Sequence, residues 1–342
     1  MATIKEIAKL AGVSRGTVDR VLNNRGDVNP DTEKNIREII KTLNYSPNVA
    51  GKNLAVRKRK LKLGFILFGT VDNDSFFADV VEGIESRAAE LSDFGVTVEI
   101  RKTGEDIPQQ QVNHINELVE SGINGLAIAP LNHPGVADKL RELSKLKIPV
   151  VTTNSDIPDC GRLAYVGSNY YKCGETAAGL MNIITKGTAN IGIISGSPDI
   201  LCNSERMAGF SNCAQKLFPD LKIIDVNNNN DIDDESYLFT REMLIKHPVI
   251  DALYITAAGV SGACRAVCEL GLKDKLSIVS FDATPSILQL LHDGTITVTI
   301  AQQPYIQGSM PLDILLDYLS MGTLPEKELN YTEIEIKIRE SI

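Results

Sequence analysis

The 342-residue sequence has no tryptophan, no C-x-x-C pair and no apolar run as long as a membrane span. Its six cysteines are scattered, which predicts buried reduced thiols rather than a zinc site or a disulfide framework. The first residues also lack the charged-then-apolar pattern of a signal peptide. These absences predict a cytoplasmic protein with no membrane attachment, no metal site and no cofactor.

Sequence patterns typical of enzymes are missing as well. No G-x-G-x-x-G loop follows the first predicted strand, and there is no G-x-x-x-x-G-K-[ST] loop or G-x-S-x-G elbow. The histidines lie far apart in sequence, at positions 114, 133, 247 and 292. We therefore expect a protein that is not an enzyme. The alternatives are a sugar-metabolising or nucleotide-dependent α/β enzyme, and a solute-binding protein.

Positive charge is concentrated at one end of an acidic chain. The formal net charge is −9, but residues 1–60 carry thirteen Lys and Arg against six Asp and Glu, or about +7. The remainder is therefore near −16. A compact basic head on an acidic body is the distribution expected when one small domain contacts nucleic acid, because the charge of the body discourages non-specific contact with phosphate.

The basic head is patterned as three short helices. Apolar residues at helical spacing predict a helix over 4–11; Gly12 ends it, and Ser14 is placed to cap a second helix over 15–23. Pro30 begins a third helix, with isoleucines and a leucine on one face. Two short helices joined by a tight turn are typical of a helix-turn-helix, which places its second helix in the major groove of DNA. The second alternative above, a solute-binding protein, leaves this head unexplained.

From residue 61 onward, short apolar strands alternate with amphipathic helices. Continuous apolar strands separated by helices indicate parallel sheets covered on both faces, and their number favours two α/β lobes over one sheet. Ligands in such folds bind beyond the carboxyl ends of the strands. The predicted strands are 61–68, 96–101, 125–129, 149–153, 190–195, 221–226, 252–256, 276–281 and 295–301.

Three stretches of the head closely resemble the LacI/GalR family of bacterial repressors: residues 3–14, residues 17–23 and residues 43–48. The resemblance extends to the body, which is similar to periplasmic sugar-binding proteins of the ribose type. It implies an all-α helix-turn-helix head and an α/β two-lobed periplasmic-binding-protein-like (type I) body with parallel sheets. The expected domains are 1–46 (head), 47–60 (hinge helix or linker) and 61–342 (effector binding and dimerisation). We expect lobe 1 at about 61–165 and 296–324, and lobe 2 at about 166–295 and 325–342.

The resemblance also implies which head residues contact DNA. Arg15, Gly16 and Arg20 take the positions that face bases, and only the two arginines have a side chain able to bond guanine O6 and N7 together. One of these arginines contacting phosphate alone is the alternative. Leu54 matches the family's hinge leucine, which enters the minor groove; the alternative is an apolar residue that packs between linker and lobe. Thr17, Asn23 and Asn48 complete the expected DNA-binding set.

In the body, the resemblance implies an effector site between the lobes. A carboxylate, a guanidinium and an amide converging on one cleft suit a sugar or polyol, whose apolar faces stack on aromatic rings. The alternatives are that Phe76 or Phe77 is a core residue and that Arg206 and Asp282 form a structural ion pair. The expected ligand-binding residues are Asp74, Phe76, Phe77, Asn154, Asp156, Arg206, Asp282 and Gln302.

Two departures from the ribose-type pattern affect the expected ligand. The strand ending at Thr153 is followed by Asn154, Ser155 and Asp156, where an aspartate and an arginine are usual. Ala257 and Ala258 stand where an asparagine and an aspartate are common. Losing these polar groups means losing contacts to particular hydroxyls, so we expect an effector other than plain ribose.

Taken together, these features predict a transcriptional regulator, in the first place a repressor. Two heads of a homodimer would bind a near-palindromic operator, because one head contacts too few bases for useful specificity. A small sugar or polyol between the two lobes would control the affinity for DNA.

Overall fold

A computed structural model describes residues 3–22, 28–43, 60–68, 75–103, 107–198 and 200–342. Four of the expected site residues, Asn23, Asn48, Leu54 and Asp74, lie outside these ranges, as does nearly all of the expected hinge. In the described part of the chain, no helix is both long and apolar enough to cross a bilayer. The cysteines are free, and four are buried; Cys213 is half-buried and Cys268 is exposed, which differs from the expectation of uniformly buried thiols.

The head consists of α1 (Ile4–Ala11), α2 (Arg15–Leu22) and α3 (Pro30–Thr42). Thr3 caps α1 in a capping box with Glu6, and Gly12 ends that helix in the left-handed region with φ 67°. The three helices close over a small core made of Ile7, Ala8, Val18, Val21 and Ile36. The helix-turn-helix expected from the sequence is confirmed at the level of its helices.

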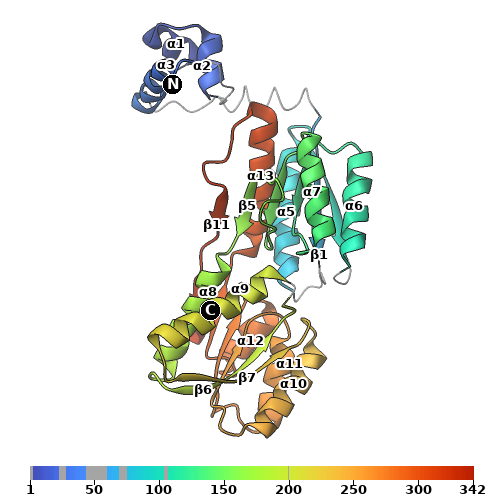
Figure 1. The fold of residues 1–342 in the computed structure, drawn as a ribbon, viewed down its shortest axis with the longest axis vertical. Helices are drawn as coiled ribbons and strands as arrows, with labels where there is room; N and C mark the ends of the chain where they lie inside the picture. The colour runs from blue at the N-terminus through green and yellow to red at the C-terminus, as the bar shows by residue number, and fades with distance from the viewer. Residues whose placement is uncertain (1–2, 23–27, 44–59, 69–74, 104–106, 199) are drawn as a thin grey trace.

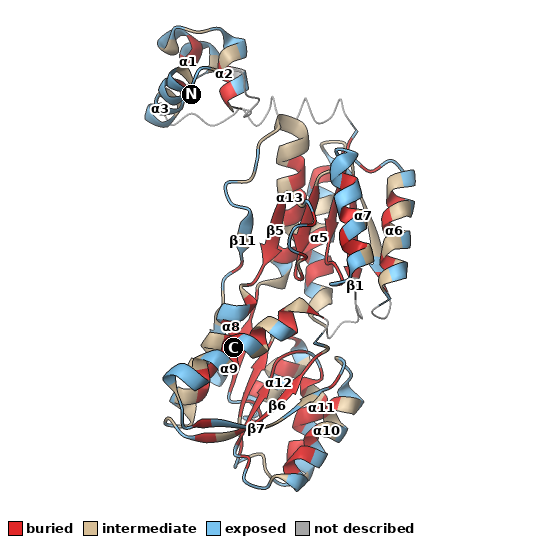
Figure 2. Cartoon of the chain, in the orientation of Figure 1, coloured by how far each residue is buried: buried red, intermediate tan, exposed pale blue. Residues whose placement is uncertain are grey.

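The body contains two six-stranded sheets, each covered by helices (Figures 1 and 2). The first sheet has the order β11-β5-β4-β3-β1-β2, and the second has the order β12-β10-β9-β8-β6-β7. Neighbouring strands are parallel except β12, which runs antiparallel to β10. The strands are β1 (Lys62–Phe68), β2 (Thr97–Thr103), β3 (Gly125–Ile128), β4 (Val150–Thr153), β5 (Ala164–Gly167), β6 (Ala189–Ser195), β7 (Leu221–Asn228), β8 (Ala252–Ile255), β9 (Ser277–Phe281), β10 (Val298–Ala301), β11 (Leu329–Tyr331) and β12 (Glu335–Lys337).

Each sheet with its helices forms one lobe. The first lobe contains α5 (Phe76–Ser92), α6 (Pro108–Glu120), α7 (Pro134–Lys145) and α13 (Pro304–Met321). The second contains α8 (Tyr170–Ile184), α9 (Leu201–Leu217), α10 (Asp233–Lys246), α11 (Val260–Glu269) and α12 (Pro285–His292). The strands are largely buried between these helices, as expected for parallel sheets (Figure 2).

The sheet pairing corrects the expected lobe bounds in two places. β10 pairs with β9 and so belongs to the second lobe, although residues 296–324 were expected in the first. β11 pairs with β5 in the first sheet, although residues 325–342 were expected in the second. The chain passes between the lobes three times, after β5, after β10 and after β11. The expected bounds placed the second passage before β10, whereas in the structure the chain completes β10 in the second lobe and then passes to the first. Those last two passages lie side by side at the functional site described next.

Candidate functional site

Helix α2 exposes several of its residues to solvent. Val18 and Val21 are buried in the core of the head, so Arg15, Gly16 and Arg20 stand exposed on the remaining faces of the helix. At the start of α2, the Ser14 hydroxyl accepts a hydrogen bond from the Thr17 backbone N–H at 3.1 Å and lies 2.9 Å from the Thr17 hydroxyl. The helix is therefore fixed at its start while both arginines remain accessible.

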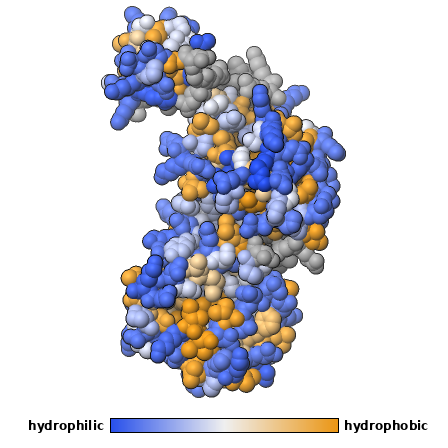
Figure 3. Space-filling model, viewed as in Figure 1, coloured by the Kyte–Doolittle hydropathy of each residue, from blue (hydrophilic) through white to orange (hydrophobic). Residues whose placement is uncertain are grey.

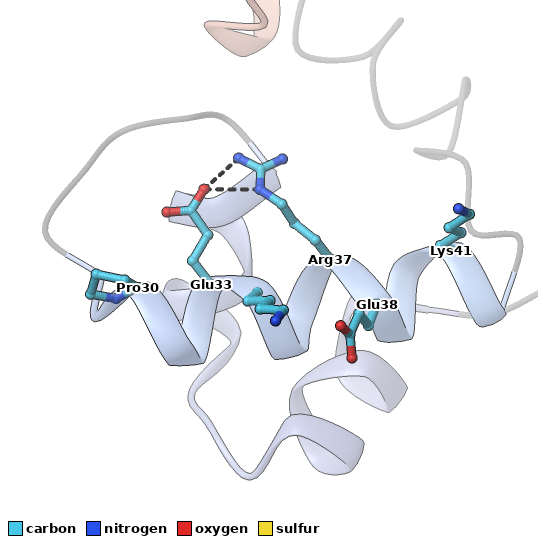
Figure 4. A pocket seen from close by; sticks show the side chains of 6 residues that line it. Pro30, Glu33, Arg37, Glu38 and Lys41 are labelled. Atoms are coloured by element: carbon cyan, nitrogen blue, oxygen red, sulfur yellow. Dashed lines mark hydrogen bonds and ion pairs between the residues drawn. The ribbon is translucent and has the colours of Figure 1, made fainter.

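A shallow depression of about 420 Å³ runs along α3 of the head (Figure 4). All its lining residues come from this one helix, and the Arg37 Nη2 lies 2.6 Å from the Glu33 Oε1. An open surface of alternating charges offers little enclosure to a small molecule. The lining residues are Pro30, Glu33, Lys34, Arg37, Glu38 and Lys41.

A second cavity, of about 120 Å³, lies where the chain passes between the lobes. The first lobe contributes the starts of α5 and α13, and the second contributes the loop after β9, the end of β10 and β12. This position, beyond the carboxyl ends of parallel strands, is where ligands bind in open α/β folds. The lining residues are Phe76, Asp79, Asp282, Ala283, Thr284, Ala301, Gln302, Gln303, Pro304, Glu335 and Lys337.

Behind this cavity, Arg206 of α9 is buried in a network of hydrogen bonds. Its Nη2 donates to the Gln302 Oε1 at 2.6 Å, and its Nη1 donates to the Thr256 carbonyl oxygen at 2.5 Å. The guanidinium carbon lies 4.0 Å from the centroid of the Phe281 ring. Its Nε is buried without a hydrogen-bond partner among the described residues.

Asp282 is joined to Arg206 through Gln302. The Gln302 Nε2 donates to the Asp282 Oδ1 at 2.5 Å, and no direct hydrogen bond joins the carboxylate to Arg206 in the described chain. Burial raises the pKa of the Asp282 carboxyl above its ordinary value; Arg206 and Gln302 act in the opposite direction, and Asp79 adds to the rise. The alternative expected from the sequence was an ion pair between Arg206 and Asp282. In the structure Gln302 links the two residues instead, and Gln302 and Asp282 line the cavity.

Close packing of α8 against α9 fixes the position of Arg206. A Cβ on Gly174 would lie 2.2 Å from the Arg206 carbonyl oxygen, and a Cβ on Gly209 would lie 2.0 Å from the Tyr171 carbonyl oxygen. Only residues without a Cβ allow the two backbones to approach this closely. The two glycines therefore determine how far the guanidinium reaches toward Gln302.

The structure brings together some of the expected ligand-binding residues and separates others. Phe76, Asp282 and Gln302 line the cavity, with Arg206 directly behind Gln302. Phe77 packs with Phe76 against the core of the first lobe, with ring centroids 5.4 Å apart, and is not among the cavity residues. The expected alternative, in which one of the two rings is a core residue, describes Phe77.

Asn154 and Asp156 are not among the residues that line the cavity. The Asn154 side chain donates from Nδ2 to the Gln307 Oε1 at 3.4 Å, and its backbone carbonyl oxygen accepts hydrogen bonds from the hydroxyls of Tyr165 and Tyr170, at 3.0 and 2.5 Å. Asp156 accepts from Arg162 through both oxygens, at 2.7 and 2.9 Å. Arg162 thus holds this carboxylate in a bidentate ion pair. In the structure Asp156 therefore has a structural role, where the sequence led us to expect a ligand-binding one.

Sequence reasoning missed several polar groups at the site. Asp79 follows Phe76 by one helical turn, a spacing that could have indicated it. Asn229 and Asp231, after β7, bond the backbone of Ala258: the Asn229 Nδ2 donates to its carbonyl oxygen at 2.7 Å, and the Asp231 Oδ1 accepts from its N–H at 3.2 Å. Polar side chains from a neighbouring loop thus occupy the region where two alanines replaced the family's polar pair.

Comparison with known proteins identifies the family. Residues 64–323 match the periplasmic binding protein domain, and residues 3–48 match the bacterial regulatory proteins of the lacI family. The chain joins a LacI-family helix-turn-helix domain to a body that belongs to the periplasmic binding protein family. It is a DNA-binding transcriptional regulator with a body of the periplasmic-binding-protein fold.

Two relatives that match this chain along most of their length are transcriptional repressors. The ribose operon repressor of Halalkalibacterium halodurans is 28% identical over 331 residues, which span 95% of this chain and 92% of the relative. The probable transcriptional repressor ExuR of Bacillus subtilis is 28% identical over 82% of both chains. A solute-binding protein of Burkholderia graminis in complex with D-arabinose shares the fold, with a TM-score of 0.76 and 24% identity over 82% of this chain and 96% of its own.

Proposed function

We propose that this regulator is a repressor whose affinity for its operator is set by a small sugar or polyol bound at the 120 Å³ interlobe cavity. The Arg206–Gln302–Asp282 network is the observation that carries this proposal. It combines a guanidinium, an amide and a carboxylate at the point where both lobes meet. The names of relatives, among them a ribose operon repressor and a complex with D-arabinose, support the same ligand class.

Arg15 and Arg20 are proposed as the base-reading residues. Both are exposed on a helix whose other side is anchored in the head by Val18 and Val21. A guanidinium bonds guanine O6 and N7 in the major groove, whereas Gly16 has no side chain with which to read a base. Thr17 is proposed to contact phosphate, and Asn23, Asn48 and Leu54 remain proposed DNA contacts by resemblance alone.

At the effector site, Phe76 is proposed to cover an apolar face of the sugar, and Asp282 and Gln302 to bond its hydroxyls. Asp74 and Phe77 stay in the proposed set by resemblance. Asn154 and Asp156 contribute indirectly, by fixing the loop after β4 through Tyr165, Tyr170 and Arg162. An effector that bonds both lobes stabilises one arrangement of the lobes over others. If that arrangement sets the affinity for DNA, the effector changes DNA affinity by the same factor as DNA changes effector affinity.

A homodimer on a near-palindromic operator is proposed from the surface of the second lobe. β7 forms one edge of its sheet, and Ile223 and Val226 on that strand are exposed. Apolar side chains gather on this lobe in Figure 3. Exposed apolar edges are unusual on monomers because they promote association. Sedimentation should show a dimer that Val226→Asp weakens and that Leu146→Asp, an equally drastic change on an exposed residue of the first lobe, leaves intact.

The regulatory proposal is tested by DNA-binding titration of the full chain. Fragments selected from a random-sequence pool should bind better than random DNA at physiological salt, with their affinity changed by a member of a sugar and polyol panel. Binding no better than to random DNA would overturn the operator proposal. An operator affinity that no sugar or polyol alters would overturn the effector proposal and leave DNA recognition standing.

A further inference from the structure

Asp79 is a carboxylate of the first lobe that faces the effector cavity without a cation. It lies on α5, one turn after Phe76, and the two residues line the same cavity. No hydrogen bond or ion pair within the described residues involves its side chain, and its closest charged neighbour on α5 is Glu82. Asp79 is exposed to solvent, and its partial desolvation together with Glu82 raises the pKa of its carboxyl.

Asp282 faces the same cavity from the second lobe. Its Oδ1 accepts the Gln302 amide at 2.5 Å, which leaves Oδ2 without a hydrogen bond in the described structure. The residue sits in the left-handed region, with φ 72°, so the backbone itself directs this loop at the end of β9. Asp79 also contributes to the raised pKa of Asp282, which indicates that the two carboxylates are near enough to repel each other.

The charges around the cavity do not balance. Three carboxylates line it, on Asp79, Asp282 and Glu335, and Lys337 is the one cation among its lining residues. Lys337 is already engaged, because its Nζ lies 3.2 Å from the Glu335 Oε2. Arg206 lies behind Gln302 and compensates Asp282 from the side away from the cavity. Among the described lining residues, therefore, no cation pairs with either Asp79 or Asp282.

We propose that the effector carries a protonated amine that binds between Asp79 and Asp282, so that the ligand class is an amino sugar or an aminated polyol. An ammonium group has three donors and no acceptor, and it suits two carboxylates that lack donors. A hydroxyl would also bond a carboxylate, but it would leave the repulsion between the lobes uncompensated. This inference rests on the proposed function, because it assigns a ligand class to the same effector site.

Matched pairs of sugars test the inference in titration calorimetry with the full chain. The probes are D-glucosamine and D-galactosamine against D-glucose and D-galactose, each pair differing in one nitrogen, with N-acetyl-D-glucosamine as an uncharged nitrogen control. We expect at least one amine to bind tenfold or more tightly than its neutral partner and than the N-acetyl sugar. Asp79→Asn should abolish that preference, so that each amine and its neutral partner bind with similar affinity. Glu82→Gln removes a neighbouring charge outside the cavity lining and should leave the preference unchanged.

Each outcome separates this inference from the proposed function. If neutral sugars bind as tightly as the amines, the amine assignment is overturned and the sugar effector stands. If the preference survives Asp79→Asn, the assignment to this carboxylate pair is wrong. If no probe binds, the inference and the proposed sugar effector fail together, while DNA recognition is judged separately by the DNA titration.

Discussion

Replacing Gly209 with alanine should displace Arg206 and disconnect the effector network. A Cβ at this position would lie 2.0 Å from the Tyr171 carbonyl oxygen, whereas ordinary contact begins at 3.4 Å. Helices α8 and α9 would have to separate by about 1.4 Å, which is the difference between these two distances. A gap of 0.5 to 1 Å already forfeits roughly a quarter to a half of a contact's dispersion energy, so we expect a destabilisation of about 1 to 3 kcal/mol.

The same displacement has a consequence for ligand binding. The hydrogen bond from Arg206 to Gln302 is 2.6 Å long, and moving α9 by about 1.4 Å away from α8 would shift the guanidinium relative to Gln302 by a comparable amount. A donor and acceptor separated by about 4 Å no longer form a hydrogen bond. Gly209→Ala should therefore weaken effector binding as well as stability.

The assay is thermal unfolding followed by circular dichroism, because the chain has no tryptophan to report by fluorescence. The expected loss in Tm is roughly 2 to 12 °C, from about 2 to 4 °C per kcal/mol for a unit of this size. Gly179→Ala on α8 is the matched control, since its Cβ would meet nothing within 4 Å, and it should raise stability by about 0.5 to 1 kcal/mol. An unchanged or increased Tm for Gly209→Ala would refute the packing argument.

Three further predictions concern the head, the cavity and the tie between strands. Arg20→Ala should lower affinity for the operator by about 1 to 3 kcal/mol and relax preference at one base, and equal losses on operator and random DNA in anisotropy titrations would contradict a reading role. Because the folded pKa of Asp282 is raised, its contribution favours folding most at low pH and is lost as pH rises from about 3.8 toward the folded value. Asp282→Asn should therefore be more stable relative to the parent at neutral than at acid pH, and a pH-independent difference in urea titrations would count against this. Arg162→Met should destabilise the first lobe by about 3 to 5 kcal/mol, because it leaves Asp156 unpaired. Combining it with Asp156→Leu should recover part of this loss. A double variant no more stable than the single one in urea unfolding would refute the ion-pair account.

Most of the strands were predictable from the sequence, and the two edge strands β11 and β12 were not. All nine predicted strands correspond to β1–β4 and β6–β10. The three that were missed, β5, β11 and β12, have four, three and three residues. β11 and β12 lie at the edges of their sheets, and their position is fixed by pairing with strands distant in the sequence, as β11 pairs with β5. The lobe bounds were wrong at β10 and β11 for the same reason.

At the site, the sequence identified side chains better than it identified their partners. Arg206, Asp282 and Gln302 were expected at the cleft, and they form one network. Asp156 was expected to contact a ligand, but Arg162, six residues later, holds it in the first lobe. The sequence alone does not show whether a carboxylate in a loop between two strands is bonded by a ligand or by an arginine. Asp79 was missed because an acidic residue early in a helix usually indicates only a favourable helix dipole.

The segment 302–304 is the element through which the cavity can act on the rest of the first lobe. Gln302 bonds Arg206 and Asp282 of the second lobe. Gln303, with φ 53°, donates to Glu335 at 3.1 Å and accepts from the Glu333 N–H at 3.0 Å, so the passages after β10 and β11 are joined to each other. Pro304 then begins α13, whose eighteen residues span about 27 Å at 1.5 Å per residue.

Helix α13 ends far from the cavity, near the start of the first sheet. A Cβ on Gly125, at the beginning of β3, would lie 3.3 Å from Leu319 in the last turns of α13, and Gly125 pairs with Leu63 at the beginning of β1. The chain enters the body immediately before β1. A ligand that shifts Asp282 or Gln302 therefore moves the start of a helix whose other end packs where the head's connection reaches the body. Because a packed helix moves as a unit, we propose α13 as a route that couples the two sites without requiring a change in either sheet.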